Sequence, residues 1–190
     1  QAPLPQFNYR DQQQQFLFYE TALAKLNALP GVASASALFR IPLVGLATST
    51  FTIEGKPVPL GDEPNCDYRT ISPNYFRTIG IPLRKGREFT ERDKVDAPDA
   101  VIINEELARR FFGNEDPVGK RLQIGAETKR FREIVGVVGN AKLTSLDGSV
   151  DPAVLLVAHA GHAVAVEVQA ERWRLGDDRQ VRPAARLAEI

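Results

Sequence analysis

The sequence predicts an α+β fold in which a few helices cover short strands. Three observations indicate this class: one clear amphipathic helix pattern near the N-terminus, many short β-branched or alternating apolar segments, and turn residues between them. The length of 190 residues suits one large domain or two small ones. A chain of this size buries a core without metal or disulfide support.

The first helix is expected just after a proline-rich, extended lead-in over residues 1–9. Asp11 followed by Gln14 resembles a capping box. Pro30 and Gly31 end the pattern. One apolar face recurs at spacings of three and four residues, through Phe16, Tyr19, Leu23 and Leu26.

Three strands and a short helix follow. Residues 33–39 alternate as a strand that packs on the first helix, and residues 50–54 and 65–71 form two more. Ser72 and Pro73 are expected to cap a short helix over 74–79, which Gly80 ends. Residues 1 to about 85 thus predict a βαβ-like sheet covered on one face.

The second half changes character after the Thr90-x-x-Asp93 cap signature. Asn104 caps a helix that runs through Phe112, directs Leu107, Phe111 and Phe112 to a core, and ends at Gly113. A short helix is expected at 184–190. Strands are predicted at 100–103, 121–124, 130–138, 153–157 and 163–169.

Composition excludes several classes of function. Lys plus Arg and Asp plus Glu both number 24, so the formal charge is zero and no electrostatic attraction to nucleic acid or an anionic membrane is expected. No run approaches the ~20 apolar residues of a membrane span. The chain opens with Gln and contains no Met, so we expect it to be part of a larger protein whose targeting or membrane segments lie elsewhere. Cys66 is the only cysteine and is interpreted as a spare thiol at a polar edge.

The spacing of the glycines does not match either of two nucleotide-binding motifs, the P-loop and the dinucleotide-binding fingerprint. Five residues lie between Gly113 and Gly119, where a P-loop has four between its glycines, and Arg121 stands where a Ser or Thr would bind Mg²⁺. A turn after the preceding helix is the better interpretation. Gly136 and Gly139 do not form a dinucleotide fingerprint and are interpreted as bends.

A metal site and a hydrolytic site are weakly supported. His159 and His162, with Glu167 beyond them, provide fewer ligands than a stable zinc site needs, so solvated loop histidines are favoured. No Gly-x-Ser-x-Gly elbow is present. The carboxylate pairs Glu105/Glu106 and Asp177/Asp178 are sequence neighbours that need not share a site. We therefore predict no catalytic, cofactor-binding or metal-binding residues.

Aromatic side chains lie next to capping and turn residues, as core anchors do. A docking surface is the alternative interpretation for some of them. The set comprises Phe51, Tyr68, Tyr75, Phe76, Phe89, Phe111, Phe112 and Phe131.

Seven short motifs occur in a fixed order along the chain. They are Leu29-Pro-Gly-Val32, Ile71-Ser-Pro-Asn-Tyr-Phe-Arg-Thr-Ile-Gly-Ile-Pro-Leu83, Gly86-Arg-Glu-Phe-Thr90, Val101-Ile-Ile-Asn-Glu105, Ala108-Arg-Arg-Phe-Phe112, Glu115-Asp-Pro-Val-Gly-Lys-Arg-Leu122 and Ile134-Val-Gly-Val-Val-Gly139. This ordered set resembles the periplasmic core domain of MacB/FtsX-like ABC transporter permeases. The similarity runs from about Leu4 to Val157, and the motifs are most similar to those of the orphan permeases of acidobacteria.

This resemblance implies a two-part ectodomain. A porter-like subdomain would combine residues 1–89 with a return segment at 159–190, and a mainly β subdomain would be inserted at 90–158. The implied function is transmission of ATP-driven motion of membrane helices to a periplasmic substrate or partner, without catalysis. The implied partners are its own transmembrane helices, a cytoplasmic ATPase, a periplasmic adaptor or lipoprotein, and a second copy in a homodimer. The implied location is the periplasmic face of the bacterial inner membrane.

Two alternatives stay open from the sequence. One is a free-standing periplasmic protein that binds a peptide or lipid in a cleft. The other is a metal-assisted hydrolase that uses His159, His162 and Glu167.

Overall fold

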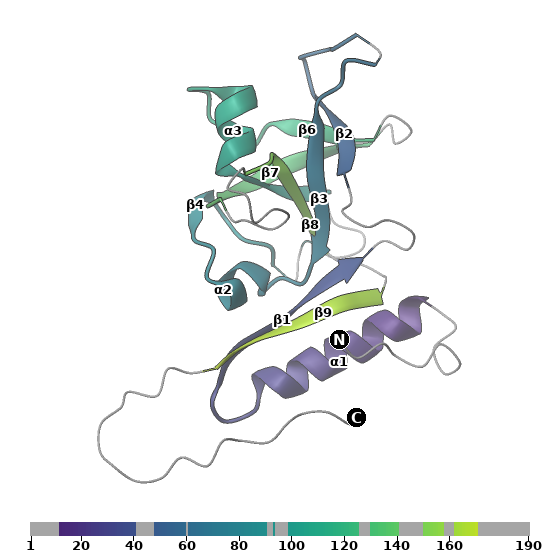
Figure 1. Ribbon diagram of the computed structural model, residues 1–190, viewed down its shortest axis with the longest axis vertical. Helices are drawn as coiled ribbons and strands as arrows, with labels where there is room; N and C mark the ends of the chain where they lie inside the picture. The colour runs from purple at the N-terminus through teal and green to yellow at the C-terminus, as the bar shows by residue number, and fades with distance from the viewer. Residues whose placement is uncertain are drawn as a thin grey trace.

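A computed structural model describes residues 12–40, 48–59, 61–90, 93, 99–125, 130–140, 150–157 and 162–170. Two expected features, the lead-in over 1–9 and the helix over 184–190, lie outside these residues. Figure 1 shows the arrangement of the described elements. In chain order they are α1 (Gln12–Asn27), β1 (Val32–Arg40), β2 (Thr48–Ile53), β3 (Asn65–Ile71), α2 (Tyr75–Ile79), β4 (Leu83–Gly86), β5 (Ala100–Asn104), α3 (Glu105–Phe112), β6 (Arg121–Ile124), β7 (Phe131–Val138), β8 (Ala153–Val157) and β9 (His162–Ala170).

The long N-terminal helix and the strand after it are confirmed. α1 packs Tyr19 and Leu23 onto Ala35 and Ala37 of β1, and Leu26 joins at the edge of this cluster. The small alanines allow the helix to approach the strand closely. β9 pairs with β1 along an antiparallel ladder that runs from Val32↔Ala170 to Arg40↔His162. These elements form one layer, which we call the α1–β1–β9 layer.

Six other strands close into a ring. Following the pairings, β2 joins β6, β6 joins β7, β7 joins β5, β5 joins β8, β8 joins β3, and β3 returns to β2. The closing pair is short, from Thr48↔Asp67 to Thr50↔Asn65, because β1 occupies the same edge of β3 further along. Ring closure satisfies backbone groups that an open sheet would leave at its edges. We call this unit the barrel.

The barrel interior is filled by alternate residues of its strands, except in β7, where a register shift against β5 places Ile134 and Val137 inside. Fully or nearly fully buried side chains include Phe51, Val101, Ile103, Leu122 and Ile134. α3 covers this cluster with Leu107 and Phe112, and the Phe111 ring meets that of Phe51 edge-on at 4.9 Å. The interior is therefore a packed core and holds no channel.

A second apolar cluster lies on the outer face of the barrel under α2. Phe76 and Tyr75 pack against Ile102, Val135 and Leu155, which project outward from the strands that bury Ile103 and Ile134 inside. Strands β5, β7 and β8 are thus buried on both faces, which explains their continuous runs of aliphatic residues.

The expected βαβ-like sheet over residues 1 to about 85 is wrong. β1 and β3 pair antiparallel, and so do β2 and β3. The parallel pairs are β3 with β8 and β5 with β7, so they join strands that are distant in sequence. Local alternation predicted each strand, but pairing between remote segments is not encoded in that local pattern.

The second half follows the expected order. Asn104 caps α3, accepting a hydrogen bond at Oδ1 from the Leu107 N–H at 3.0 Å. The Ser72 cap of α2 is wrong, because Asn74 occupies the cap position and the Ser72 hydroxyl bonds elsewhere. The Thr90/Asp93 signature is confirmed, since Asp93 Oδ2 accepts the Thr90 N–H at 2.7 Å.

Most of the aromatic residues act as core anchors. Phe51, Tyr75, Phe76, Phe89 and Phe112 are buried, while Tyr68 and Phe111 are partly buried against the barrel core. Phe131 is the exception, because 36% of its surface is exposed at the start of β7.

The expected division at residues 89 and 158 stays a prediction. β2 and β3, which precede residue 89, share the barrel cluster with β5 to β8, which follow it. The α1–β1–β9 layer keeps a separate cluster of its own.

Two buried serines on one face of β1 give a matched test of hydrogen bonding. Ser34 Oγ lies 2.7 Å from Thr78 Oγ1, whereas the Oγ of fully buried Ser36 has no hydrogen-bond partner among the described residues. Ser34→Ala should lower the free energy of unfolding by about 1 kcal/mol, while Ser36→Ala should leave it unchanged or raise it, since it removes an unsatisfied hydroxyl. Urea unfolding of both variants measures the difference, and an equal loss in both would contradict it.

Candidate functional site

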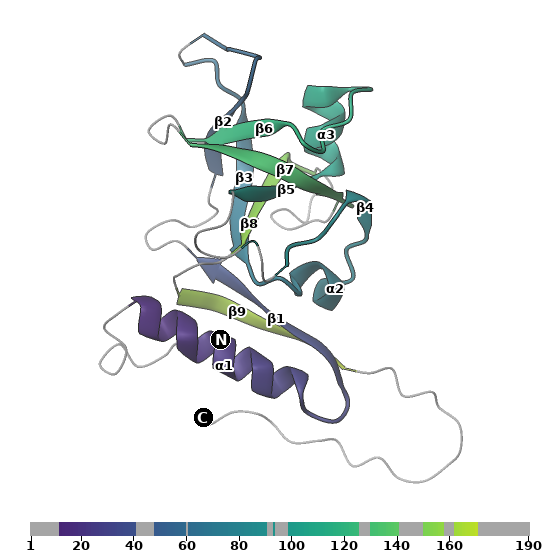
Figure 2. The ribbon, with the colours of Figure 1, turned by 180° about the vertical axis from the view of Figure 1, so that it is seen from behind.

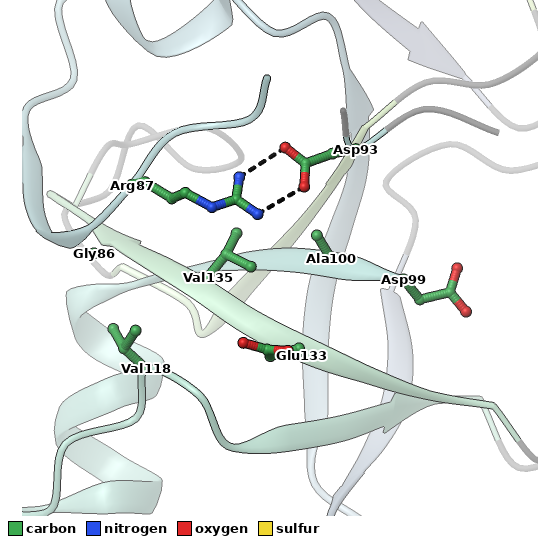
Figure 3. A pocket seen from close by; sticks show the side chains of 8 residues that line it. All are labelled: Gly86, Arg87, Asp93, Asp99, Ala100, Val118, Glu133 and Val135. Atoms are coloured by element: carbon green, nitrogen blue, oxygen red, sulfur yellow. Dashed lines mark hydrogen bonds and ion pairs between the residues drawn. The ribbon is translucent and has the colours of Figure 1, made fainter. Parts of the chain in front are cut away.

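A concavity among the described residues lies beside the ion pair of Arg87 and Asp93, shown in Figure 3. Arg87 donates from Nη1 and Nη2 to the two oxygens of Asp93, at 2.7 and 2.8 Å. The Asp93 side chain is 5% exposed and that of Arg87 is 49% exposed. Thr90 adds its N–H and its hydroxyl to the same carboxylate. These hydrogen bonds restrain the segment that follows β4, from Arg87 to Thr90.

The cavity has a volume of about 490 Å³ and is lined by polar and apolar groups. Val135, Ala100 and Val118 form apolar parts of the wall. Asp99, which also lines it, makes an ion pair with Arg130. Within the described segments, no three His, Cys, Asp or Glu side chains lie close enough to share a metal ion. The lining includes no combination of nucleophile, base and oxyanion donor.

Two glycines allow the backbone to approach closely at this place. β4 and β7 pair at Gly86↔Gly136. A Cβ on Gly136 would lie 2.3 Å from the Arg87 carbonyl oxygen, and one on Gly86 would lie 2.2 Å from the Val135 carbonyl oxygen. Gly86 also has a φ of +70°. Gly136 lies within β7 at a register shift against β5, and its missing side chain allows the close contact with Arg87.

Sequence reasoning missed the Arg87–Asp93 pair. It identified Asp93 from its spacing to Thr90, as part of a cap. An arginine six residues before an aspartate carries no helical or strand signal, so only the fold of the loop brings the two side chains together.

The pKa of the Asp93 carboxyl is held below its ordinary value. The hydrogen bond from Arg87 is the main cause and those from Thr90 add to it, while burial acts in the opposite direction. The pKa of Arg87 is raised, chiefly by the same hydrogen bond. The pair is therefore fully ionised at neutral pH.

Acid should remove the stabilising contribution of Asp93. Because its pKa is lower in the folded chain than in the unfolded chain, the contribution is present above the unfolded pKa of about 3.9 and is lost as the pH falls through the folded value. Asp93→Asn should thus be less stable than wild type at about pH 7, with a gap that narrows below about pH 4. Urea unfolding at both pH values measures this gap. Glu115→Gln, at a pair with half-exposed side chains, is the control and should show a small gap at either pH. A gap for Asp93→Asn that does not change with pH would contradict the assignment.

The P-loop-like segment is a structural turn, as expected. It follows α3, and Glu115 N–H donates to the Phe112 carbonyl. Lys120 forms an ion pair with Glu115, and its Nζ lies 5.8 Å from the centre of the Phe112 ring. Lys56 joins Glu115 and the same ring from the loop after β2. The lysine that a phosphate cradle would need is held in this network.

The interpretation of Cys66 as a thiol at a polar edge is wrong. Cys66 is 2% exposed and belongs to the barrel core. Burial raises the pKa of the thiol to about 12, and Asp67 adds to the shift. The thiol therefore stays protonated at neutral pH. Since the thiolate is the nucleophilic form, we expect Cys66 to be unreactive.

Alkylation should detect this burial. Iodoacetamide should leave Cys66 unmodified in the folded chain at about pH 8, since the reagent cannot reach the buried sulfur and the thiol is protonated. In denaturant it should modify Cys66 fully. Mass spectrometry reads the added mass. Complete labelling of the native chain on the time scale of a free thiol would show that Cys66 is accessible.

The proposed metal ligands are not brought together by the described strands. His162 pairs with Arg40 and Glu167 pairs with Ser36, so the two positions are separated by four residues of β1, or about 13 Å. His159 lies outside the described residues. The structure thus gives no support to the hydrolase hypothesis.

The neighbouring carboxylates of α3 have separate partners. Glu105 forms an ion pair with Arg84 at 3.2 Å. Glu106 accepts from Arg109 and Arg110, and the hydrogen bond from Arg109 is the main reason that its pKa is lowered to about 2. Asp177 and Asp178 lie outside the described residues.

Gly139 is a close-approach position too. A Cβ there would lie 3.1 Å from Pro82 Cγ, and its N–H donates to the Pro82 carbonyl. Its interpretation as a bend is replaced by this contact with the segment before β4.

No helix among the described residues combines the length and the apolar character that a membrane span requires.

Comparison with known proteins agrees with the motif order. The macrolide export ATP-binding/permease protein MacB of Aggregatibacter actinomycetemcomitans is 32% identical over 79 residues, which cover 42% of this chain and 12% of that protein. Among solved structures, the periplasmic region of MacB from Actinobacillus actinomycetemcomitans has a TM-score of 0.54 at 18% identity, covering 80% of this chain and 64% of the other. The extracellular domain of the noncanonic ABC-type transporter YknZ from Gram-positive bacteria has a TM-score of 0.53 at 19% identity, covering 80% and 72%.

The structural matches support a mixed α/β fold rich in strands that is similar to these periplasmic domains. The chain spans about an eighth of the curated relative's length. The family model for the MacB-like periplasmic core domain matches residues 5–180. Because this match covers most of the chain, the protein belongs to the family of MacB-like periplasmic core domains of ABC transporter permeases.

Proposed function

We propose that this domain transmits ATP-driven motion of the permease's membrane helices to a periplasmic substrate or partner protein, and performs no chemistry of its own. The supporting observation is the position of the first and last described elements. α1 and β9 both lie in the α1–β1–β9 layer, whereas every strand of the barrel comes from the chain between them (Figure 1). Motion of the membrane helices that is passed to either α1 or β9 would therefore move the same layer.

The packing suits such a role. The ring closure, the two-sided burial of β5, β7 and β8, and the ion pairs at the barrel end all restrain internal motion. Close-packed interiors transmit strain instead of absorbing it. Figure 2, the view from behind, shows α3 at the end of the molecule remote from α1. A movement of the layer would therefore be carried to a distant surface.

The finer architecture belongs to this proposal. The α1–β1–β9 layer would correspond to the porter-like subdomain built from both chain ends, and the barrel would contain the inserted β subdomain. The partners would be the permease's own transmembrane helices, a cytoplasmic ATPase, a periplasmic adaptor or lipoprotein, and a second copy in a homodimer. The domain would act at the periplasmic face of the inner membrane.

A distance from the barrel to the bilayer tests the proposal. Arg109, whose side chain is 71% exposed on α3, is changed to Cys in the full-length permease, labelled, and reconstituted with its ATPase. Energy transfer to a headgroup acceptor should change when ATP is added. A hydrolysis-deficient ATPase is the control for repeated cycling. An unchanged distance through ATP binding and hydrolysis would contradict the proposal.

One observation favours a second candidate, a ligand-binding domain. The cavity beside Asp93, at about 490 Å³, is in the size range of small-molecule sites, about 300–1,000 Å³. Titration calorimetry with lipid and peptide panels separates the two functions. The transmission proposal expects no saturable heat, whereas a stoichiometric, saturable signal would favour ligand binding.

A further inference from the structure

The contact between the α1–β1–β9 layer and the barrel is narrow. β1 and β3 pair at Leu38↔Ile71 and Phe39↔Thr70 only, whereas β1 and β9 pair along nearly their whole length. Layer and barrel each have an apolar cluster of their own. Direct strand pairing between the two units is therefore short. We call this short ladder, together with the contacts of α2 on β1 and β9, the seam.

Ser72 extends this short ladder by an unusual route. Its N–H donates to the Ala37 carbonyl at 2.9 Å, as a further strand residue would. Its own carbonyl turns away and accepts the Tyr75 N–H at the start of α2, at 3.1 Å. The side-chain hydroxyl takes the place of that carbonyl and accepts the Ala37 N–H at 2.9 Å. One residue therefore connects β1, β3 and α2.

α2 adds the rest of the seam. Its Phe76 and Tyr75 belong to the apolar cluster on the barrel's outer face, so the helix is part of the barrel side. From there Thr78 meets Ser34 of β1, with 2.7 Å between the hydroxyl oxygens, and Leu38 of β1 packs at the edge of the same cluster. Both hydroxyl contacts are buried, so water does not readily replace them.

We propose that Ser72 is a positioning residue that fixes the angle between the α1–β1–β9 layer and the barrel. Loss of its hydroxyl would leave the Ala37 N–H without this acceptor. Of the two hydrogen bonds between Ala37 and Ser72, only the one from the Ser72 N–H to the Ala37 carbonyl would then remain. The cores of the two units do not include this residue. The expected consequence is a looser joint between two units that stay folded. Its relevance to transport rests on the proposed function, but the joint itself does not.

Ser36 provides the matched control. It is a fully buried serine on β1, close to the seam, and its hydroxyl makes no hydrogen bond within the part of the chain that the structure describes. Ser36→Ala deletes the same atom as Ser72→Ala without removing a hydrogen bond of the described residues. Any effect of Ser72→Ala that comes from general loss of a buried hydroxyl should appear in both.

The proposal is tested by measuring the distance between two spin labels on the isolated chain, without ATP, by electron paramagnetic resonance. Spin labels at Lys25→Cys on α1 and Arg109→Cys on α3 report the orientation of layer to barrel, and buried Cys66 stays unlabelled. The distance distribution should become about twofold wider in Ser72→Ala, as expected for a joint that loses its hinge restraint, and should be unchanged in Ser36→Ala. Ser72→Thr, which keeps a hydroxyl, should restore the narrow distribution.

Several outcomes would overturn the assignment. A lower unfolding free energy in Ser72→Ala with an unchanged distance distribution would show a merely structural role, and equal broadening in Ser36→Ala would remove the specificity. If Ser72→Ala does not fold, Thr78→Val decides, because it breaks the Ser34 contact at the same seam and should broaden the distribution too. These results do not depend on ATP, so their failure is distinct from failure of the transmission proposal.

Discussion

Gly136→Ala is expected to lower the free energy of unfolding by about 3 kcal/mol, at the upper end of the usual cost of overpacking. The added Cβ would lie 2.3 Å from the Arg87 carbonyl oxygen, and both atoms belong to backbone or are fixed to it. Relief would require β4 to move away from β7, where Gly86 pairs with Gly136. That movement would also disturb the bidentate bonds of Arg87 to Asp93. Urea unfolding monitored by circular dichroism measures the loss.

Gly55→Ala is the matched control for this prediction. Gly55 has a φ of +77°, and no heavy atom of the described residues lies within 4 Å of the position a Cβ would take. The cost of a left-handed alanine, about 1 kcal/mol, is therefore its only expected penalty. A loss in Gly136→Ala no larger than that in Gly55→Ala would show that the two strands are not in tight contact.

Asn104→Ala should cost about 2–4 kcal/mol, because one buried side chain serves three elements. Its Oδ1 accepts the Leu107 N–H of α3 at 3.0 Å and the Ala153 N–H of β8 at 2.9 Å. Its Nδ2 donates to the Asp151 carbonyl at 2.8 Å. Alanine would leave the N–H groups of Leu107 and Ala153, whose hydrogen bonds are buried, without this acceptor. The unfolding midpoint in urea should fall with an unchanged slope if the denatured state is unaffected.

Asn104→Asp separates the two roles of the amide. Aspartate keeps an acceptor for both N–H groups but loses the donor to Asp151, so its stability should lie between wild type and Asn104→Ala. Equal losses in the two variants would show that the Oδ1 contacts contribute little.

The sequence predicted elements better than their assembly. The bounds of β3, β6 and β8 agree with the strands expected at 65–71, 121–124 and 153–157, since short alternating or apolar segments between turn residues carry a clear local signal. The antiparallel pairing of β1 with β3 was not anticipated, because pairing depends on contacts between remote segments. The closure of β2 onto β3 is of the same kind.

Some features of the candidate site could be predicted from the sequence and others could not. The Asn104 cap and the Thr90/Asp93 signature follow rules of fixed spacing, and the structure confirms both. The partners Arg87 and Asp93, and the seam at Ser72, depend on how loops return to the barrel. A serine before a proline has the same local sequence whether it caps a helix or completes a strand ladder, so its hydroxyl could not be placed from sequence alone.

The central claim is that layer and barrel move together as one stiff body when the membrane helices move. In the full-length transporter, the distance between labels at Lys25→Cys and Arg109→Cys should stay the same with and without ATP, while the distance from Arg109→Cys to the bilayer changes. An ATP-dependent change in the Lys25–Arg109 distance, with a fixed distance to the bilayer, would contradict the claim.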